Sequence, residues 1–453
     1  MPVRKKILLL LALAVLIRIL AFIVFRSTFD FVLTGQIHGS HAYDTYAVNL
    51  LQTGVFGALP GIPDASIPPL YAYILAGVYS LFGRGAPQVV LLNVIVDLVS
   101  IVLLVDIGRR LFPDGQAVGL VAGLAAALYP YLIFQSLTLI DSPIFAALLT
   151  AFIWAMVVLR QRQDNSASTL ALAGFGGLLL GLATLTRPVL AAFVVLLPLW
   201  FLFRRTPRET AVRLAPVALL AIVVIGVWTA RNARVYERFM PMTATAGSNF
   251  WQGNSPLVVP LLRAGYDVQW TSPESLEASD PRSAEADEER FRLALDYLRQ
   301  HPEDIPELMW FKFITQWSID VAPRFNPTDS AGPLVTVPGR AEAYQVPQLA
   351  PTDPITRYST PLFDRIGRSV HRLYWGGMLL LAIAGSVLVW RAWREVSLIW
   401  FVLLAMTVAY VVFHPATRYR APGDPFVFLL AAYAIAWVAR RTGVARTRPQ
   451  GSS

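Results

Sequence analysis

The residues best suited to chemistry lie in one short segment near the N-terminus, His38-Gly-Ser-His41-Ala-Tyr-Asp44. Histidine and carboxylate side chains at this spacing can chelate a divalent metal, and a carboxylate alone can act as a general base. On a helix, positions i, i+3 and i+6 spread over about 120° of the surface, so the three groups converge poorly on one ion. We therefore predict that Asp44 is a base and that no metal is bound, with ordinary loop polarity as the alternative.

A second acid, Asp141, stands directly before Ser142 and Pro143, at the start of an apolar block. A carboxylate in this position often caps the first N–H groups of a helix, and proline is favoured just after such a cap. The same position also suits a ligand for a substrate hydroxyl. Both interpretations remain open from the sequence.

Three arginines stand at the ends of apolar blocks: Arg187, directly before Pro188, and Arg418 and Arg420, which flank Tyr419. The guanidinium group binds phosphate and carboxylate in a bidentate manner. We predict that Arg418, Tyr419 and Arg420 contact a bound anion, with anchoring at the membrane interface as the alternative. For Arg187 the two interpretations have equal support.

The composition shows which elements must position these residues. Of 453 residues, 55% are hydrophobic and 15% are charged, and the apolar residues come in blocks of roughly 16 to 23, close to the length that crosses a bilayer. This pattern predicts an α-helical polytopic membrane protein and excludes cytosolic enzymes and disordered chains. The absence of cysteine excludes disulfides and thiolate chemistry. The net charge of +9 lies in short clusters between apolar blocks, which indicates membrane orientation and no nucleic-acid partner.

The blocks predict about ten transmembrane helices. They cover residues 7–25, 87–108, 117–134, 142–160, 168–186, 188–203, 209–229, 373–390, 396–413 and 424–439. The first follows a basic start but is longer than a signal-peptide core, so we interpret it as a span. The block 69–83 is short and opens with prolines, so we expect it to remain outside. With that choice, sixteen Lys and Arg residues lie in inside loops and five in outside loops, which places both termini in the cytoplasm.

These spans divide the chain into three predicted parts. Residues 1–230 form a seven-span catalytic membrane module with the first external loop at 26–86. Residues 231–372 form an extracytoplasmic insert of mixed or mainly helical structure, with helices expected at 283–300 and 304–319. Residues 373–453 form a three-span module with a cytoplasmic tail.

Two charges lie inside predicted spans, where each costs about 2.5–3.5 kcal/mol. Arg18 and Asp97 lie at about the same depth, roughly 16 Å from the cytoplasmic ends of spans 1 and 2. We predict that they form a structural ion pair.

The order of several short motifs resembles that of the GT-C-fold membrane glycosyltransferases, in the branch of the protein O-mannosyltransferases and lipid A aminoarabinose transferases. The motifs are Tyr43-Asp44-Thr45-Tyr46-Ala47, Pro68-Pro69-Leu70-Tyr71, Gly108-Arg109-Arg110-Leu111-Phe112, Tyr129-Pro130, Thr186-Arg187-Pro188 and Arg418-Tyr419-Arg420. The resemblance implies a polyprenyl-phosphate-linked sugar as donor, Asp44 in the position of the first-loop catalytic carboxylate and Asp141 as the second external acid. Some relatives carry an acid before Pro-Pro-Leu-Tyr and bind metal there, whereas this chain has Ser66-Ile67.

The residues and the resemblance together predict a glycosyltransferase, transferring a hexose or pentose to an acceptor hydroxyl on a glycan, lipid or protein at the extracytoplasmic face. Single displacement with inversion is expected, in the plasma (inner) membrane of a prokaryote. Asp44 is the predicted base, Arg418, Arg420 and Arg187 the phosphate contacts, and Asp141 a ligand of the sugar or acceptor. The alternative is a transporter or flippase for a lipid-linked saccharide, and a third possibility is a non-catalytic envelope assembly protein.

Overall fold

The computed structural model describes residues 2–269, 271–273, 276–278, 280, 283–324, 330–335, 344–348 and 361–442. In these ranges, eight helical segments are long and apolar enough to cross a membrane. They lie in α1 (Val3–Val24), α6 (Ala86–Leu111), α9 (Ser142–Gln161), α10 (Ala167–Thr186), α12 (Pro207–Tyr236), α18 (Pro361–Leu388), η3 with α19 (Trp390–Ala392 and Trp393–Val412), and α20 with η4 and α21 (Thr417–Arg420, Ala421–Gly423 and Asp424–Arg441). The predicted α-helical, multi-pass membrane architecture is confirmed.

The predicted span 117–134 is not one straight helix. It consists of α7 (Gly115–Leu128) and α8 (Pro130–Ser136), which meet at an angle of 60°. Pro130 has no N–H to donate, and its ring disfavours helical geometry at Tyr129, which is extended with ψ 115°. The predicted span is therefore interrupted at Pro130.

Two further apolar helices are short. The predicted span 188–203 consists of η1 (Pro188–Leu190) and the 12-residue α11 (Ala191–Leu202). The block 69–83, which we expected to remain outside, forms α5 (Pro69–Phe82). Its 14 residues extend over only about 21 Å, less than the hydrocarbon thickness. By length, therefore, the described chain has eight spans, or nine if α7 and α8 count as one, where ten were predicted.

Short helices and one hairpin complete the described structure. Near the N-terminus they are α2 (Arg26–Phe29), α3 (Phe31–Thr34) and α4 (His41–Thr53); in the insert they are α13 (Ala246–Gly253), α14 (Val258–Ala264), α15 (Ala284–Gln300), η2 (Pro302–Asp304), α16 (Ile305–Gln316), and the antiparallel strands β1 (Ser330–Val335) and β2 (Tyr344–Gln348). The helix expected at 283–300 is confirmed, and Ser283 caps it through Ala286 N–H. Helix α12 continues past residue 230 and α18 begins before residue 373, so both long helices reach into the predicted insert. Part of the insert and most of the predicted cytoplasmic tail lie outside the described residues.

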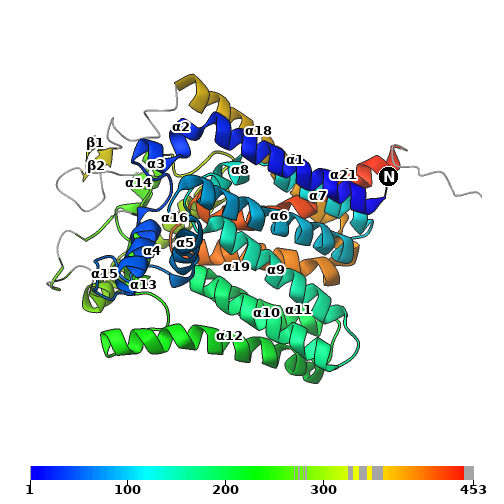
Figure 1. Cartoon of the computed structure of the whole chain (residues 1–453), viewed down its shortest axis with the longest axis horizontal. Coiled ribbons are helices and arrows are strands. Elements are labelled where there is room, and N and C mark those ends of the chain that lie inside the picture. The colour runs from blue at the N-terminus through cyan, green and yellow to red at the C-terminus, as the bar shows by residue number, and fades with distance from the viewer. Residues whose placement is uncertain are drawn as a thin grey trace, which may run out of the picture.

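The long helices run side by side in one bundle (Figure 1). The N-terminus lies at one end of the bundle, which we call the terminal end. At the opposite end, the loop end, Figure 1 shows α4, α5, α13 to α16 and the β1–β2 hairpin gathered together. In the apolar stretches of α9 and of α20 to α21, 83% of the residues are buried, against 17% in α1. These segments therefore form the centre of the bundle.

The predicted ion pair between Arg18 and Asp97 is confirmed. Arg18 Nε donates to Asp97 Oδ2 at 2.9 Å, between α1 and α6, and the Arg18 side chain is 1% exposed. Its guanidinium also donates to the carbonyls of Ala14 and Ala127. These bonds offset the cost of placing a cation at this depth.

Candidate active site

Asp44 lies at the loop end in the first turn of α4, and its carboxylate is held on two sides. Tyr79 of α5 donates its hydroxyl at 2.8 Å, and Arg84, just after α5, donates through Nε at 2.9 Å and Nη2 at 2.7 Å. The Asp44 side chain is 8% exposed, whereas that of Arg84 is 44% exposed. The Asp44 carboxylate, which accepts hydrogen bonds from Arg84, raises the pKa of that guanidinium above its ordinary value, against the opposing effect of burial. The carboxylate therefore has one fixed donor, Tyr79, and one donor that is free to move toward solvent.

Asp141 stands at the N-cap of α9, but its side chain makes no capping bond. Instead, Arg187 approaches it side-on, with Nε 2.6 Å from Oδ2 and Nη2 2.7 Å from Oδ1. Burial opposes the charge on Arg187, yet the Asp141 carboxylate holds the pKa of that guanidinium well above its ordinary value. The capping interpretation of Asp141 therefore does not describe how the carboxylate is used.

Two tyrosines connect the Asp44 and Asp141 pairs. Tyr43 and Tyr71 pack edge to face with ring centroids 5.0 Å apart. Burial raises the pKa of Tyr71, and the neighbouring Tyr79, Asp141 and Asp44 act in the same direction. Tyr71 therefore lies near both acids, Asp44 and Asp141.

A single contact between two backbone segments joins the loops that carry the acids. Ser40 N–H donates to the carbonyl of Leu139 and Leu139 N–H to the carbonyl of His38, both at 2.9 Å. Gly39 lies between them with φ 118°, and a Cβ there would lie 2.1 Å from the Leu139 carbonyl oxygen. Only glycine combines this dihedral with this close approach, so Gly39 is required for the junction. The junction lies a few residues from each acid.

Arg418 and Tyr419 lie beside the Asp141 pair. Arg187 Nη1 donates to the Arg418 carbonyl at 3.3 Å, and the Arg187 guanidinium lies 5.5 Å from the Tyr419 ring. Arg418 itself donates to Asp267 Oδ2 at 2.8 Å and to the Gln269 side chain, both from the insert. The structure thus brings Asp141, Arg187, Arg418 and Tyr419 together, as the sequence prediction requires of one site.

Arg420 points away from this group, into the bundle. It donates to Asp424 Oδ1 at 3.0 Å and to the Ser318 carbonyl at 2.9 Å. Its guanidinium also lies 3.8 Å from the Trp375 ring, and its side chain is 3% exposed. These contacts support a structural role, connecting α20 to α16 and α18, over the predicted phosphate contact.

The histidines of the His38-x-x-His41 motif do not converge with Asp44. His38 is buried and packs edge to face on Phe29, with centroids 5.2 Å apart, whereas His41 is exposed. In the described part of the chain, no group of three or more His, Asp and Glu residues is placed to hold a metal ion. The carboxylates of Asp44, Asp141 and Asp267 instead accept hydrogen bonds from guanidinium groups. The described donor set therefore does not fit a divalent cation.

The sequence interpretation did not identify Arg84, Tyr79 and Asp267 as members of the site. Arg84 carries a signal that could have found it, because it is one of the five cations assigned to outside loops, as are Arg187 and Arg418. Tyr79 and Asp267 have no such feature in the sequence, because a tyrosine in an apolar helix and an aspartate in a long loop are both common.

A buried lysine, Lys312 of α16, supports the segment before Arg418. Its ammonium donates to the Gly253 carbonyl at 2.9 Å, to Asn254 Oδ1 at 2.9 Å and to the Val412 carbonyl at 3.3 Å. Burial lowers the pKa of Lys312 to about 7. The side chain joins α13 and α16 to the end of α19.

We expect the stability of the protein to rise with pH above 7 because of Lys312. The folded-state pKa is about 7 against an ordinary value of 10.5, so between these values the unfolded state binds more protons than the folded state. Each pH unit in this range adds at most about 1.4 kcal/mol. Thermal unfolding in detergent from pH 7 to 9.5 measures the slope. Lys312→Met should remove it, and an unchanged slope in this variant would contradict the assignment.

Comparison with known proteins agrees with the fold. Residues 66–230 match the model of the dolichyl-phosphate-mannose-protein mannosyltransferase family. A search of curated proteins gives no match. Among solved structures, the oligosaccharyltransferase of Archaeoglobus fulgidus in complex with Zn and sulfate has 13% identity and a TM-score of 0.55, covering 97% of this chain and 50% of that chain. Its apo form has 14% identity and the same TM-score of 0.55, covering 98% and 51%.

A third structure, ArnT from Cupriavidus metallidurans bound to undecaprenyl phosphate, has 15% identity and a TM-score of 0.42, covering 98% of this chain and 81% of that chain. The chain spans about half the length of the oligosaccharyltransferase chains that it matches. The two oligosaccharyltransferase structures, at a TM-score of 0.55, share the fold of this chain. The chain therefore has the GT-C fold of membrane glycosyltransferases, as its resemblance to them predicted.

Proposed function

We propose that this protein transfers a sugar from a polyprenyl-phosphate donor to an acceptor hydroxyl at the loop end of the bundle. The observation that carries the proposal is the gathering of two buried acids, Asp44 and Asp141, with Arg187 and Arg418 at that end. The family match over residues 66–230 and the shared fold support the same reaction class. The acceptor is a glycan, a lipid or a protein.

The proposed reaction is a single displacement with inversion. The acceptor oxygen bonds to the anomeric carbon while the bond from that carbon to the lipid phosphate oxygen breaks. The acceptor proton passes to the Asp44 carboxylate, and the negative charge that develops on the departing polyprenyl phosphate is stabilised by Arg418 and Arg187. Asp141 accepts a hydrogen bond from a hydroxyl of the sugar or acceptor.

Arg84 has a specific place in this scheme. A carboxylate that accepts two hydrogen bonds from a guanidinium is a poor base until that guanidinium moves away. Arg84 is half exposed and bonds no other carboxylate among the described residues, so its side chain can turn from Asp44 toward an incoming phosphate. We therefore assign Arg84 as a positioning residue that holds Asp44 until the donor arrives.

Arg84→Ala should slow transfer by up to about 10²-fold, because Asp44 is no longer held in place before the donor arrives and the donor phosphate loses the guanidinium that turns toward it. Arg84→Lys keeps the charge but not the side-on pair, so its transfer rate should lie between those of Arg84→Ala and the wild type. Arg26→Ala is the matched control, since Arg26 also pairs with an aspartate of the first loop, Asp30, at 3.1 Å. Rates with a radiolabelled donor give the comparison. Equal losses for Arg84→Ala and Arg26→Ala would show a general effect on the loop.

The function itself is tested with purified protein in liposomes, a radiolabelled sugar on polyprenyl phosphate, and an extract that contains acceptors. Label moving from lipid to acceptor supports the transferase. Movement of intact lipid-linked sugar across the bilayer without transfer would instead indicate a flippase.

We further propose that the loop end is extracytoplasmic and that both termini are cytoplasmic in a prokaryotic plasma membrane. The chain has no cysteine, so single cysteines report topology without background. An impermeant thiol reagent should label Glu288→Cys in intact cells and should label Arg208→Cys only after permeabilisation. Both positions are exposed, one in α15 and one at the start of α12. The opposite labelling pattern would invert the topology and place the proposed site in the cytoplasm.

A further inference from the structure

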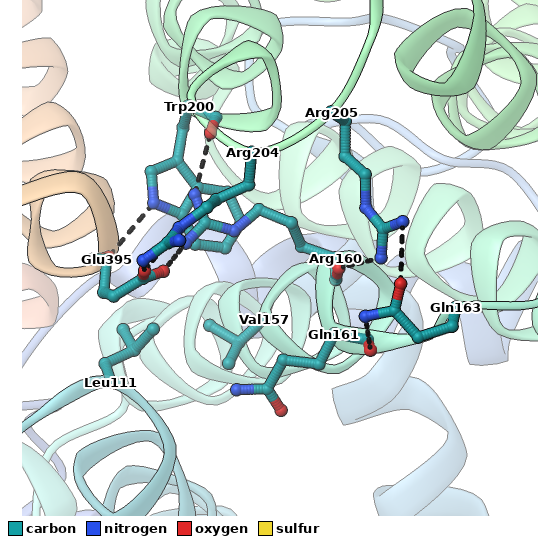
Figure 2. Close-up of a pocket in the computed structure, with 9 residues that line it drawn as sticks. All are labelled: Leu111, Val157, Arg160, Gln161, Gln163, Trp200, Arg204, Arg205 and Glu395. Carbon is teal, nitrogen blue, oxygen red and sulfur yellow. Dashed lines mark hydrogen bonds and ion pairs between the residues drawn. The ribbon is translucent and has the colours of Figure 1, made fainter.

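A second polar site lies at the terminal end of the bundle, far from the two acids along the helices. A cavity of about 400 Å³ opens where the ends of α6, α9 and α11 meet the start of α19 (Figure 2). Its volume is within the range typical of small-molecule sites. Arginines from two helix ends line it, with a single carboxylate, Glu395.

The cavity lining carries more positive than negative charge. Figure 2 shows Arg160 and Arg204 converging on Glu395, and both guanidinium groups bond its carboxylate. Arg205, the third arginine, donates to the carbonyls of Arg160 and Arg162, which carry no net charge. The next acid is Glu209, whose Oε1 pairs with Arg205 Nη1 at 3.6 Å. The hydrogen bonds that Glu209 accepts come from Thr206, at the start of α12.

The loops around the cavity add to the excess of positive charge. Residues 160–166, 203–209 and 389–395 together contain seven arginines and three acids. The Arg160 side chain is only 4% exposed, and its guanidinium lies 3.5 Å above the Trp200 ring, so at least one of these cations is held in a partly desolvated place. A desolvated excess of positive charge favours a bound anion.

The surroundings of the cavity favour a lipid over a small ion. α9 and α19 both belong to membrane-spanning segments and have their ends here, which places the cavity at headgroup level. Leu111 and Val157 form its apolar wall. On α11, Val195 and Leu199 are 72% and 46% exposed, so the helix that supplies Trp200 to the cavity lining also presents apolar surface for an acyl chain. Basic pockets between spans are typical headgroup sites.

We propose that this cavity binds the phosphate of an anionic phospholipid. Arg204 is the principal ligand, because its side chain is 56% exposed and can turn from Glu395 to a phosphate without leaving a buried group unpaired. Arg160 and Trp200 form the fixed wall behind it. The site is independent of the proposed transfer reaction.

The test is native mass spectrometry of delipidated full-length protein titrated with dioleoyl phosphatidylglycerol, and separately with dioleoyl phosphatidylcholine and inorganic phosphate. The wild type should bind one phosphatidylglycerol about tenfold more tightly than phosphatidylcholine, as one charge-assisted hydrogen bond allows. Inorganic phosphate at equal concentration should not displace it. Displacement by phosphate would show a free-anion site and overturn the lipid assignment.

Two variants of the cavity lining and one control variant test whether Arg204 binds the phosphate. Arg204→Ala should abolish the tenfold preference, whereas Arg162→Ala, an exposed arginine of the neighbouring loop that does not line the cavity, should preserve it within about twofold. Glu395→Gln removes the competing carboxylate and should tighten phosphatidylglycerol binding. Equal losses for Arg204→Ala and Arg162→Ala, or weaker binding by Glu395→Gln, would mean that only general charge attraction acts.

Discussion

Asp44→Asn should reduce sugar transfer by about 10²- to 10⁴-fold, the usual contribution of a general base. Asparagine keeps the size of the side chain, and its single carbonyl oxygen can still accept hydrogen bonds from the Tyr79 hydroxyl and Arg84 Nε, which now bond Asp44 Oδ1 at 2.8 Å and 2.9 Å. It cannot accept the proton of the acceptor hydroxyl. The loss should therefore appear in the rate of transfer, while binding of polyprenyl phosphate and a single symmetric peak in size-exclusion chromatography are retained.

The matched control for Asp44→Asn is Asp30→Asn in the segment just before α4. Asp30 also pairs with an arginine, Arg26, and caps α3 through Val32 N–H, but it does not belong to the candidate site. Transfer by Asp30→Asn should stay within a few-fold of wild type, since loss of such a cap costs only about 1 kcal/mol of stability. If Asp44→Asn transfers at a near-normal rate, the role of base passes to Asp141, the second acid that the sequence predicts at the site.

Asp97→Ala should destabilise the folded protein by about 3–5 kcal/mol. The Arg18 side chain is 1% exposed, and its bond to Asp97 is the only ion pair it makes in the described structure. Without that carboxylate a guanidinium remains in the centre of the membrane with two backbone carbonyls as its partners. Unfolding by a graded denaturant in mixed micelles measures the change in free energy.

The double variant Arg18→Met/Asp97→Leu should recover much of the lost stability, because no unpaired charge remains. Asp106→Ala is the control for the loss of a carboxylate from the same helix. Asp106 pairs with Arg109 and Arg110 at the membrane boundary and is 23% exposed, so its removal should cost about 1 kcal/mol. A double variant as unstable as the sum of the single variants would show that the two groups do not stabilise one another.

Some features of this structure could be predicted because they depend on residues close together in the sequence or on depth in the bilayer. Helix α15 begins after Ser283 with acids in its first turn, and both cap and charge are encoded within four residues. Arg18 and Asp97 could be paired from depth alone, because a bilayer gives every residue of a span a calculable height. The same depth argument could not detect the bend between α7 and α8, where Pro130 interrupts an otherwise apolar block.

The partners of the site residues could not be predicted, because they depend on how distant segments pack. Arg418 bonds Asp267, which lies 151 residues away in the insert, and Arg187 bonds Asp141 across 46 residues. Arginine is long and can choose among several acids at similar distances. The sequence therefore predicted several residues that the structure brings together, but not which acid each arginine binds, and that pairing decides which carboxylate can act as the base.

The contact between Gly39 and Leu139 makes the two loops that carry Asp44 and Asp141 a single mechanical unit. Two hydrogen bonds of 2.9 Å cross it, and no residue with a Cβ fits at its centre. Force applied to the first loop by an incoming substrate is thus transmitted directly to the turn that carries Asp141. The loop that carries Asp44 and the turn that carries Asp141 should therefore move together. The site should not populate a state in which Asp44 is displaced and Asp141 is still in place.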